Sequence, residues 1–275
     1  MTLAANLARI RQQIAEACRR AHRTEPEVAL MAVTKTHSAE TVMEAYAAGL
    51  RLFGENRVQE WQEKLPALEH LFNAARSESS AYQRCGPSEI ARSDSPSAQD
   101  SPSAQDSTQD PGAEFHLIGP LQSNKTARAA ELFHAIDAVY SLKIATRLDA
   151  AARALGKRLP ILIEVKLSHE ESKHGVAPAD LPELLAGLAP LENLLPAGLM
   201  TVPPWADDPE QSRAYFRELR RLRDASLAAC PTLTQLSMGM SNDFAVAIEE
   251  GSTCIRIGTA LFGIRQVAAG ALRSG

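Results

Sequence analysis

Residues 28–36 read Val-Ala-Leu-Met-Ala-Val-Thr-Lys-Thr, a short apolar run that is followed by a lysine. The run has the length and composition of a buried strand, and residues 39–48 beyond it have the spacing of a helix. A strand that leads directly into a helix is the repeating unit of folds built on parallel sheets. The stretch therefore predicts a βα unit with Lys35 at the C-terminal end of its strand.

The same alternation continues through the rest of the chain. We predict strands at residues 28–33, 50–53, 115–118, 138–140, 161–167, 197–202, 233–238 and 254–257. Helices are expected at 39–48, 124–133, 142–155, 181–188, 209–229 and 243–249, and Leu3, Leu7, Ile10 and Ile14 predict an amphipathic helix before them. Strand–helix repeats of this number are typical of an α/β protein with a single (β/α)8 TIM barrel, here with an extra N-terminal helix.

The domain boundaries follow from length and composition. A chain of 275 residues fits one barrel, which typically needs about 250. We predict one barrel domain over residues 1–265 and a flexible tail over 266–275. Residues 77–112 are rich in Ser, Asp, Gln and Pro, and 94–99 repeat directly as 100–105. Because such a segment buries little apolar surface, we interpret it as a disordered insertion without a role, with a regulatory or partner-binding role as the alternative.

Composition narrows the class of protein. The net charge of −4 predicts no overall field that would attract nucleic acid or an anionic membrane. Four widely separated cysteines form no C-x-x-C pair, so neither a disulfide framework nor a metal site is expected. No signal peptide is apparent, and no apolar run reaches the ~18 residues of a membrane span. We expect a cytoplasmic monomer with no membrane or nucleic-acid partner.

Two later strand ends could bind an anion. The strand predicted at 233–238 leads into Ser237-Met238-Gly239-Met240-Ser241, and the last strand leads into Gly258-Thr259. Phosphate sites of such barrels recur in the loops after strands seven and eight, where glycine lets backbone amides approach and hydroxyls donate. Each turn alone is weak support, because glycine is common in turns. Together they favour a phosphate site at the mouth. A phosphate site beside Lys35 in turn favours a functional role for this lysine over that of a solvated surface residue.

Arg256 lies two residues before Gly258, so strand alternation places both on one face. A buried arginine needs a partner, and an acidic neighbour would serve. The functional alternative is a hydrogen bond to a cofactor ring nitrogen. A guanidinium cannot give that nitrogen a proton, so the ring would stay neutral and would be a poor electron sink.

Several longer blocks carry a family resemblance: Phe53-Gly54-Glu55-Asn56, residues 116–125 (HLIGPLQSNK), 198–201 (GLMT), 236–241 (LSMGMS) and 255–259 (IRIGT). With residues 32–36, they resemble in order the YggS/PROSC family of pyridoxal phosphate homeostasis proteins. The resemblance implies a barrel like the alanine racemase N-terminal domain, with pyridoxal 5′-phosphate (PLP) held as a Schiff base. Carried over by motif, the cofactor-binding residues are Lys35 (Schiff base), Asn56 (ring), Arg256 (ring nitrogen), and Ser237, Gly258 and Thr259 (phosphate).

The chain departs from the family pattern at two positions. Lys166 stands where the family commonly has Asn, which puts the contacts of that Asn in doubt. Phe115 stands where the family often has Trp, a change that should preserve packing. Met200 is expected either near the cofactor or in the core, and His116 is interpreted as structural rather than as a proton shuttle.

The resemblance implies a PLP carrier for vitamin B6 homeostasis that is not an enzyme, with PLP-dependent apoenzymes as possible recipients. The first alternative is a PLP-dependent amino-acid racemase, which needs acid–base groups on both faces of its substrate. Relatives of alanine racemase take one of them from an added domain, and residues 266–275 are too few for one. The second alternative is a Schiff-base enzyme that uses Lys35 without a cofactor. No catalytic residue is assigned.

Overall fold

A computed structural model describes residues 2–84, 112–168 and 174–263 of the chain. Parallel strands form a closed barrel in which each strand pairs with its neighbours in sequence and β8 pairs with β1. The strands are β1 (Ala29–Val33), β2 (Leu52–Glu55), β3 (Glu114–Leu117), β4 (Ala135–Val139), β5 (Leu159–Glu164), β6 (Leu194–Met200), β7 (Gln235–Met240) and β8 (Cys254–Ile257). The (β/α)8 barrel predicted from the sequence is confirmed.

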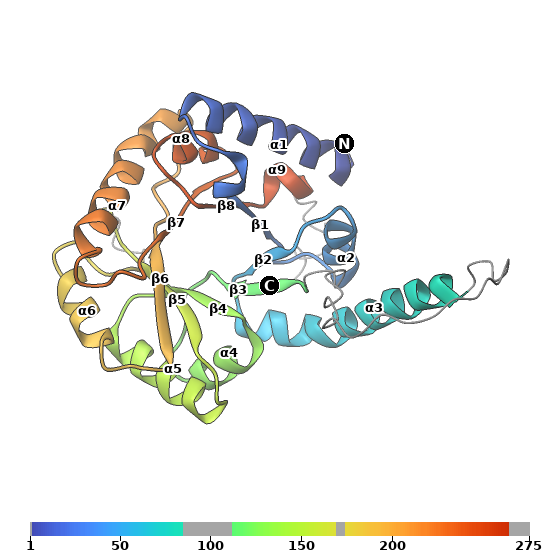
Figure 1. The fold of residues 1–275 in the computed structure, drawn as a ribbon, viewed down its shortest axis with the longest axis horizontal. Helices are drawn as coiled ribbons and strands as arrows, with labels where there is room; N and C mark the ends of the chain where they lie inside the picture. Colours follow the sequence, from blue (N-terminus) through green and yellow to red (C-terminus); the bar gives the residue numbers. More distant parts are fainter. Residues whose placement is uncertain (1, 85–111, 169–173, 264–275) are drawn as a thin grey trace, which may run out of the picture.

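Helices surround the barrel and follow the strands in turn (Figure 1). They are α1 (Leu3–Arg20), α2 (Ala39–Ala47), α3 (Val58–Arg84), α4 (Thr126–Leu132), α5 (Leu142–Ala154), α6 (Leu181–Leu188), α7 (Arg213–Ser226), α8 (Phe244–Glu249) and α9 (Thr259–Phe262). Short 3-10 turns, η1 (Glu25–Glu27) and η2 (Pro209–Ser212), precede β1 and α7. The predicted helix at 209–229 is therefore divided into η2 and α7.

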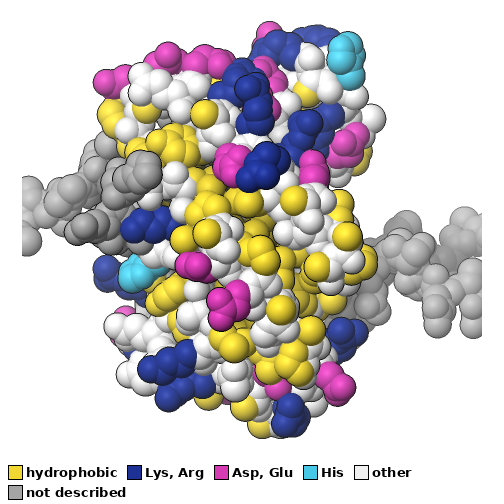
Figure 2. Space-filling view, turned by 90° about the vertical axis from the view of Figure 1, so that its left-hand side faces the viewer, with side chains coloured by type: hydrophobic (Ala, Val, Ile, Leu, Met, Phe, Trp, Pro, Cys, Tyr) yellow, Lys and Arg dark blue, Asp and Glu magenta, His cyan; other side chains and the backbone are white. Residues whose placement is uncertain are grey.

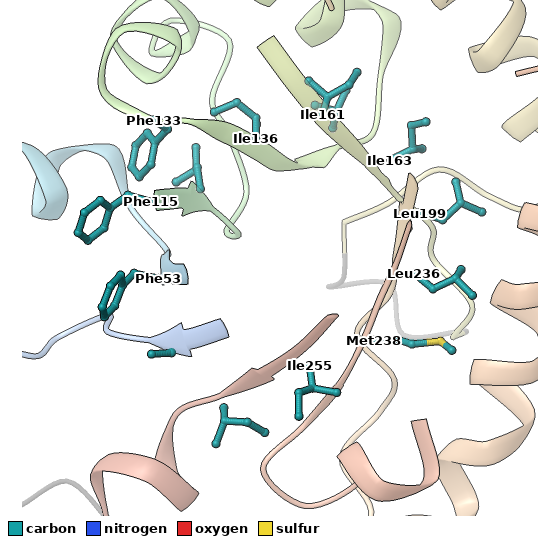
Figure 3. Packing of buried hydrophobic residues seen from close by; sticks show 14 of the residues in the cluster. Phe53, Phe115, Phe133, Ile136, Ile161, Ile163, Leu199, Leu236, Met238 and Ile255 are labelled. Carbon is teal, nitrogen blue, oxygen red and sulfur yellow. The ribbon is translucent and has the colours of Figure 1, made fainter. Parts of the chain in front are cut away.

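The hydrophobic core lies mainly between the outer face of the barrel and the helices (Figure 3). Phe115 stacks on Phe53 with ring centroids 5.1 Å apart and on Trp61 at 4.2 Å. Phe115 therefore fills this layer, as expected for a residue that replaces a larger aromatic side chain. A separate small cluster of Ala138, Leu162 and Met200 lies on the inner face of the strands. Met200 thus belongs to the packed interior.

The N-terminal helix α1 supports the last part of the barrel. Its buried side chains, which include Leu7, Ile10 and Ile14, lie at the predicted helical spacing. The side chain of Asn6 is buried and its Nδ2 donates a hydrogen bond to the carbonyl of Leu261, 2.9 Å away in α9. Figure 1 shows α1 beside both α8 and α9. This helix therefore fixes the segment that follows Gly258.

Several strands begin earlier than the sequence predicted. Strand β4 covers Ala135–Val139 rather than 138–140, β5 covers Leu159–Glu164 rather than 161–167, and β6 covers Leu194–Met200 rather than 197–202. Apolar residues such as Leu167 and Val202 continue the pattern after the ladder has ended. The sequence pattern shows only where the apolar residues lie. Where a strand begins and ends depends on the backbone hydrogen bonds that it makes with the neighbouring strand.

The start of the predicted insertion is also corrected. Helix α3 runs to Arg84, so residues 77–84 continue the helix. Adding residues to a helix that already exists is far less costly than nucleating one, which is why polar composition alone placed the start of the insertion too early. Figure 1 shows α3 extending away from the barrel. The remainder of the insertion and the predicted tail lie outside the described residues.

The charges on one side of the barrel are mixed in sign. Figure 2 shows the side that carries α6 and α7, where hydrophobic side chains gather near the centre and charged side chains of both signs surround them. This face therefore presents no patch of a single sign. Within the described residues, no helix combines the length and apolar character that crossing a membrane requires.

Candidate functional site

A cavity of about 510 Å³ opens at the C-terminal ends of the strands, a size within the usual ~300–1,000 Å³ of small-molecule sites. Five of the six sequence-predicted site residues line it together: Lys35, Asn56, Arg256, Gly258 and Thr259. They come from the ends of β1, β2 and β8, which are neighbours in the closed barrel. The structure thus brings these five residues to one mouth, where barrel enzymes place their active sites.

The backbone on both sides of Lys35 is held by three charged residues. The buried Glu55 accepts a hydrogen bond from the Thr34 hydroxyl at 2.8 Å and from the Lys64 ammonium at 2.6 Å. Lys64 also donates to the carbonyl oxygen of Thr34 at 3.0 Å, and the backbone N–H of Thr36 donates to Glu60. We call Glu55, Glu60 and Lys64 the Lys35 clamp.

The electrostatics of this clamp are dominated by burial. Desolvation raises the pKa of the Glu55 carboxyl, and the nearby Lys64 ammonium opposes that shift.

Thr36 adopts a left-handed backbone conformation with φ of 63°, which is uncommon for a residue with a branched side chain. Sequence reasoning missed the clamp, although the Phe-Gly-Glu-Asn block contains Glu55.

Arg256 is almost fully buried inside the barrel, 4% exposed. Its guanidinium donates to the Ser237 hydroxyl at 2.6 Å and to the carbonyl oxygen of Thr201 at 2.8 Å. Burial lowers the pKa of Arg256, while Asp137, Glu164 and other acidic neighbours act in the opposite direction. Among the described residues, these two hydrogen-bond partners of Arg256 are neutral oxygens on β7 and just after β6, and they fix the plane of the guanidinium.

The two turns predicted to bind phosphate are not at equal depth. Ser237 is fully buried below the cavity, where its hydroxyl accepts from Arg256, and it does not line the cavity wall. Ser241, from the same turn, does line the cavity, and its hydroxyl accepts from the N–H of Ala260 at 3.2 Å. Ser241 therefore lies beside Gly258 and Thr259, where Ser237 was expected.

Asn56 is placed by close packing against another motif. A Cβ on Gly119 would lie 2.3 Å from the carbonyl oxygen of Asn56, a distance that no side chain tolerates. The block that contains Gly119 can therefore lie this close to the end of β2 only because that residue is glycine. Two of the sequence motifs thus form one wall of the cavity.

The opposite wall is formed by the end of β5 and the residues beyond it. Glu164, Lys166 and Ser168 line the cavity there, together with His174. The Ser168 Oγ is buried and has no hydrogen-bond partner. Of these four, the sequence singled out Lys166 as a departure from the family pattern. Sequence reasoning missed Glu164.

His116 lies far from this mouth, in a second cavity of about 470 Å³ among residues at the beginnings of β3 to β7. Its Nδ1 lies 3.1 Å from Asp137, and its Nε2 lies 3.9 Å from Glu114. Burial would lower its pKa, but Asp137 and Glu114 outweigh burial and raise the pKa to about 9. His116 is therefore a partly buried, ion-paired side chain at the other end of the barrel. Among the described residues, no cluster of His, Cys, Asp or Glu is suited to a metal ion.

Comparison with known proteins agrees with this arrangement. The family model described as "Alanine racemase, N-terminal domain" matches residues 5–266. A pyridoxal phosphate homeostasis protein of Pseudomonas aeruginosa is 39% identical over 269 residues, covering 98% of both chains. The structure of PipY from Synechococcus elongatus PCC7942 with PLP bound is 35% identical with a TM-score of 0.73, covering 95% of this chain and 100% of PipY.

More distant structures share the fold alone. An alanine racemase of Clostridium difficile is 14% identical with a TM-score of 0.61, and the match covers 96% of this chain but 57% of the racemase. The matching part of that racemase is thus a barrel of the same kind. By its near full-length matches to the curated relatives and to the family model, the chain belongs to the family of pyridoxal phosphate homeostasis proteins, built on the alanine racemase N-terminal domain.

Proposed function

We propose that this protein binds PLP covalently through Lys35 and serves PLP homeostasis, without robust catalytic turnover of its own. The observation that carries the proposal is the meeting of Lys35, Arg256, Gly258 and Thr259 at one cavity. The names of the relatives and the PLP in the PipY structure support the same cofactor. The donor set fits PLP, because it pairs an amine for the aldehyde with hydrogen-bond donors for the ring nitrogen and phosphate.

Lys35 would supply the amine that forms the covalent bond. Its side chain is half-buried at the end of β1, and the Lys35 clamp holds the peptide groups on either side of it. A clamped backbone limits the positions that the amine can reach. The clamp would thus orient the lysine toward the cavity rather than toward solvent.

Gly258, Thr259 and Ser241 would hold the phosphate. Gly258 and Thr259 follow β8 directly, and the Ser241 hydroxyl already lies next to this turn. We include Ser241 in the proposed site and assign Ser237 a different task. Because Ser237 accepts from Arg256 at 2.6 Å, it would hold the guanidinium in place.

Arg256 is the main argument against vigorous catalysis. When bound, PLP can act as an electron sink for reactions at an amino acid, and a protonated ring nitrogen strengthens that sink. A guanidinium held against the ring nitrogen donates a hydrogen bond but no proton. In addition, none of the described tyrosine side chains lines the cavity to serve as a second acid–base group. Both features favour cofactor holding over racemisation.

The proposal extends to the setting in which the protein works. We expect a cytoplasmic monomer that passes PLP to PLP-dependent apoenzymes. Among the described residues, Cys18, Cys230 and Cys254 are free thiols, as a reducing compartment requires. Size-exclusion chromatography with light scattering tests whether the protein is a monomer. Reactivation of a PLP-free aminotransferase by the PLP-loaded protein tests whether PLP is transferred.

Borohydride reduction of the PLP-loaded protein followed by peptide mapping tests the central proposal. The pyridoxyl group should be found on Lys35, and Lys35→Ala should lose the visible absorbance band of the bound cofactor. Lys143→Ala, on α5 and outside the cavity, is the matched control and should keep the band. A pyridoxyl group mapped to Lys64 or Lys166 instead would contradict the assignment. Turnover of L-alanine or L-serine near 1 s⁻¹, the low end of common enzyme rates, would contradict the carrier role.

A further inference from the structure

The wall of the cavity formed by β5 carries a cation whose role the proposed PLP site does not use. Strand alternation places Leu162, Glu164 and Lys166 on one face, and Leu162 belongs to the cluster inside the barrel. Ile163 and Val165, in contrast, pack in the outer core. Lys166, two residues beyond the end of β5, therefore continues the inward-facing row of Glu164 and lines the cavity at the mouth.

The backbone at Lys166 is held in place by a short added bridge. Val165 pairs in parallel with Val176, the N–H of Lys166 donates to the Val176 carbonyl at 2.9 Å, and the N–H of Val176 donates to the Glu164 carbonyl at 2.8 Å. Gly175, with φ of 129°, packs so closely that a Cβ there would lie 2.7 Å from the Lys166 nitrogen. The position of Lys166 at the cavity is thus built into the fold.

Among the residues that the structure describes, two polar side chains at this wall have no partner. Within the described part of the chain, Lys166 makes no ion pair, although Glu164 shares its strand face. Ser168 lies two residues further along, and its buried Oγ has no hydrogen-bond partner. A buried hydroxyl that is left unsatisfied costs free energy, so such groups commonly mark the place of a ligand. An ammonium and a hydroxyl together are the donors that bind a carboxylate.

Glu164 is the group that could oppose an anion at this wall. Burial raises the pKa of its carboxyl, and the charge of Arg256 pulls that pKa in the other direction. Arg256 thus lies close enough to offset part of the negative charge of Glu164 when it is ionised. His174, which also lines this wall, acts on Glu164 in the same direction as Arg256.

The position across the mouth indicates which carboxylate fits. In the closed order of strands, β5 lies opposite β1, and β8 lies next to β1. The phosphate turn of β8 therefore neighbours Lys35, whereas Lys166 faces Lys35 from the far side. We infer that Lys166 and Ser168 form a carboxylate subsite, so the ligand class of this cavity is an α-amino acid whose amino group lies toward the cofactor.

This inference rests on the proposed PLP site. Two stable probes distinguish a failure of the carboxylate subsite from a failure of the PLP site. Phosphopyridoxyl-L-alanine and phosphopyridoxyl-ethylamine share the ring, phosphate and amine, but only the first carries a carboxylate. Calorimetric titration of the PLP-free protein should show about tenfold tighter binding of the alanine compound, a difference of about 1.4 kcal/mol. If neither compound binds, the PLP site itself is refuted. If both bind equally, only the carboxylate subsite is refuted.

Substitutions show which residues cause the tighter binding of the compound that carries a carboxylate. Lys166→Met and Ser168→Ala should each reduce the preference for the carboxylate, with Lys166→Met bringing the two affinities close to equal, while binding of the ethylamine compound stays unchanged. Lys166→Arg should retain most of the preference, and Lys143→Met on α5 serves as the matched control with full preference. Glu164→Gln should raise the preference. Thermal melting of each variant verifies folding, and a tenfold preference that survives Lys166→Met would overturn the inference.

Discussion

At the scale of single residues, Arg256 shows how a buried charge can be held without a carboxylate in direct contact. Among the described residues, its guanidinium donates hydrogen bonds to the Ser237 hydroxyl and to the backbone carbonyl of Thr201. Acidic side chains contribute to the electrostatic environment of Arg256 from a distance. This arrangement leaves part of the guanidinium facing the cavity, which is the orientation that a cofactor ring nitrogen requires.

Arg256→Gln should therefore weaken PLP binding and also change its spectrum. Hydrogen bonds to charged groups contribute roughly 1.5–3 kcal/mol, so affinity should fall about tenfold or more. The absorbance maximum of the bound cofactor should move, because the partner of the ring nitrogen changes. Thr259→Ala should weaken binding with an unchanged maximum, since in the proposed site Thr259 would contact only the phosphate. Spectrophotometric PLP titration of both variants measures this, and identical spectra for Arg256→Gln and wild type would contradict the ring contact.

His116 should make stability depend on pH through its ion pair with Asp137. Its folded-state pKa of about 9 lies above the ordinary value of 6.5. A raised pKa means that the stabilisation is complete below pH 6.5 and is lost as the pH rises through 9, by about 3 kcal/mol in total. Urea unfolding of wild type and His116→Gln should show the wild-type advantage shrinking between pH 6 and pH 9.5. A difference that stays constant over this range would rule out titration of His116 as the cause.

At the scale of elements, helix α3 acts on the site from outside the barrel. Lys64 of α3 bridges the end of β1, through the Thr34 carbonyl, to Glu55 at the end of β2. Its side chain is only 8% exposed, and that of Glu55 is fully buried. A buried pair of this kind contributes little net stability, but removing one member leaves an uncompensated charge.

Lys64→Met should consequently destabilise the protein by about 3 kcal/mol, measured by urea unfolding. The double variant Glu55→Gln with Lys64→Met should lose less than the sum of the two single variants, because it no longer leaves one charge unpaired. The single variant should also retain PLP more weakly, since Thr34 loses a contact beside Lys35. Strict additivity of the two substitutions would show that Glu55 and Lys64 are not coupled. Lys143→Met on α5 is the control for loss of a surface lysine.

At the scale of the whole molecule, the proposed cofactor site joins the first and the last strand of the barrel. Strands β1 and β8 pair in parallel from Ala29 with Cys254 to Ala32 with Ile257, and this pairing closes the sheet. Lys35 extends from β1, whereas Arg256, Gly258 and Thr259 belong to β8 and the turn after it. A ligand held by both strands would therefore stabilise the closure itself.

PLP should accordingly raise the melting temperature of the protein. At a free PLP concentration of 100 times Kd, the gain is about 2.7 kcal/mol, or roughly 5–10 °C for a barrel of this size. Lys35→Ala should show a smaller rise, because phosphate contacts remain but the covalent bond is lost. Scanning calorimetry with and without PLP provides the measurement. An equal rise in both proteins would show that the covalent bond adds nothing to stability.

The sequence by itself determined the barrel and the position of Lys35 at its mouth. Both are consequences of local patterns: apolar runs of strand length, helical spacing between them, and a lysine two residues after the end of the first run. Parallel strands all end at one edge, so residues that follow different strands must meet there. For that reason Lys35, Asn56, Arg256, Gly258 and Thr259 could be brought together from sequence and are found at one cavity.

Only the tertiary structure decided how deep each side chain lies. Ser237 and Ser241 belong to one turn motif, and the register of β7 against β8, which shifts between Ser237 and Met240, buries the first and places the second at the cavity. The contact of Lys64 with both Thr34 and Glu55 likewise depends on how α3 packs against the barrel. Register and helix packing arise from contacts between segments distant in sequence, and no local periodicity encodes them.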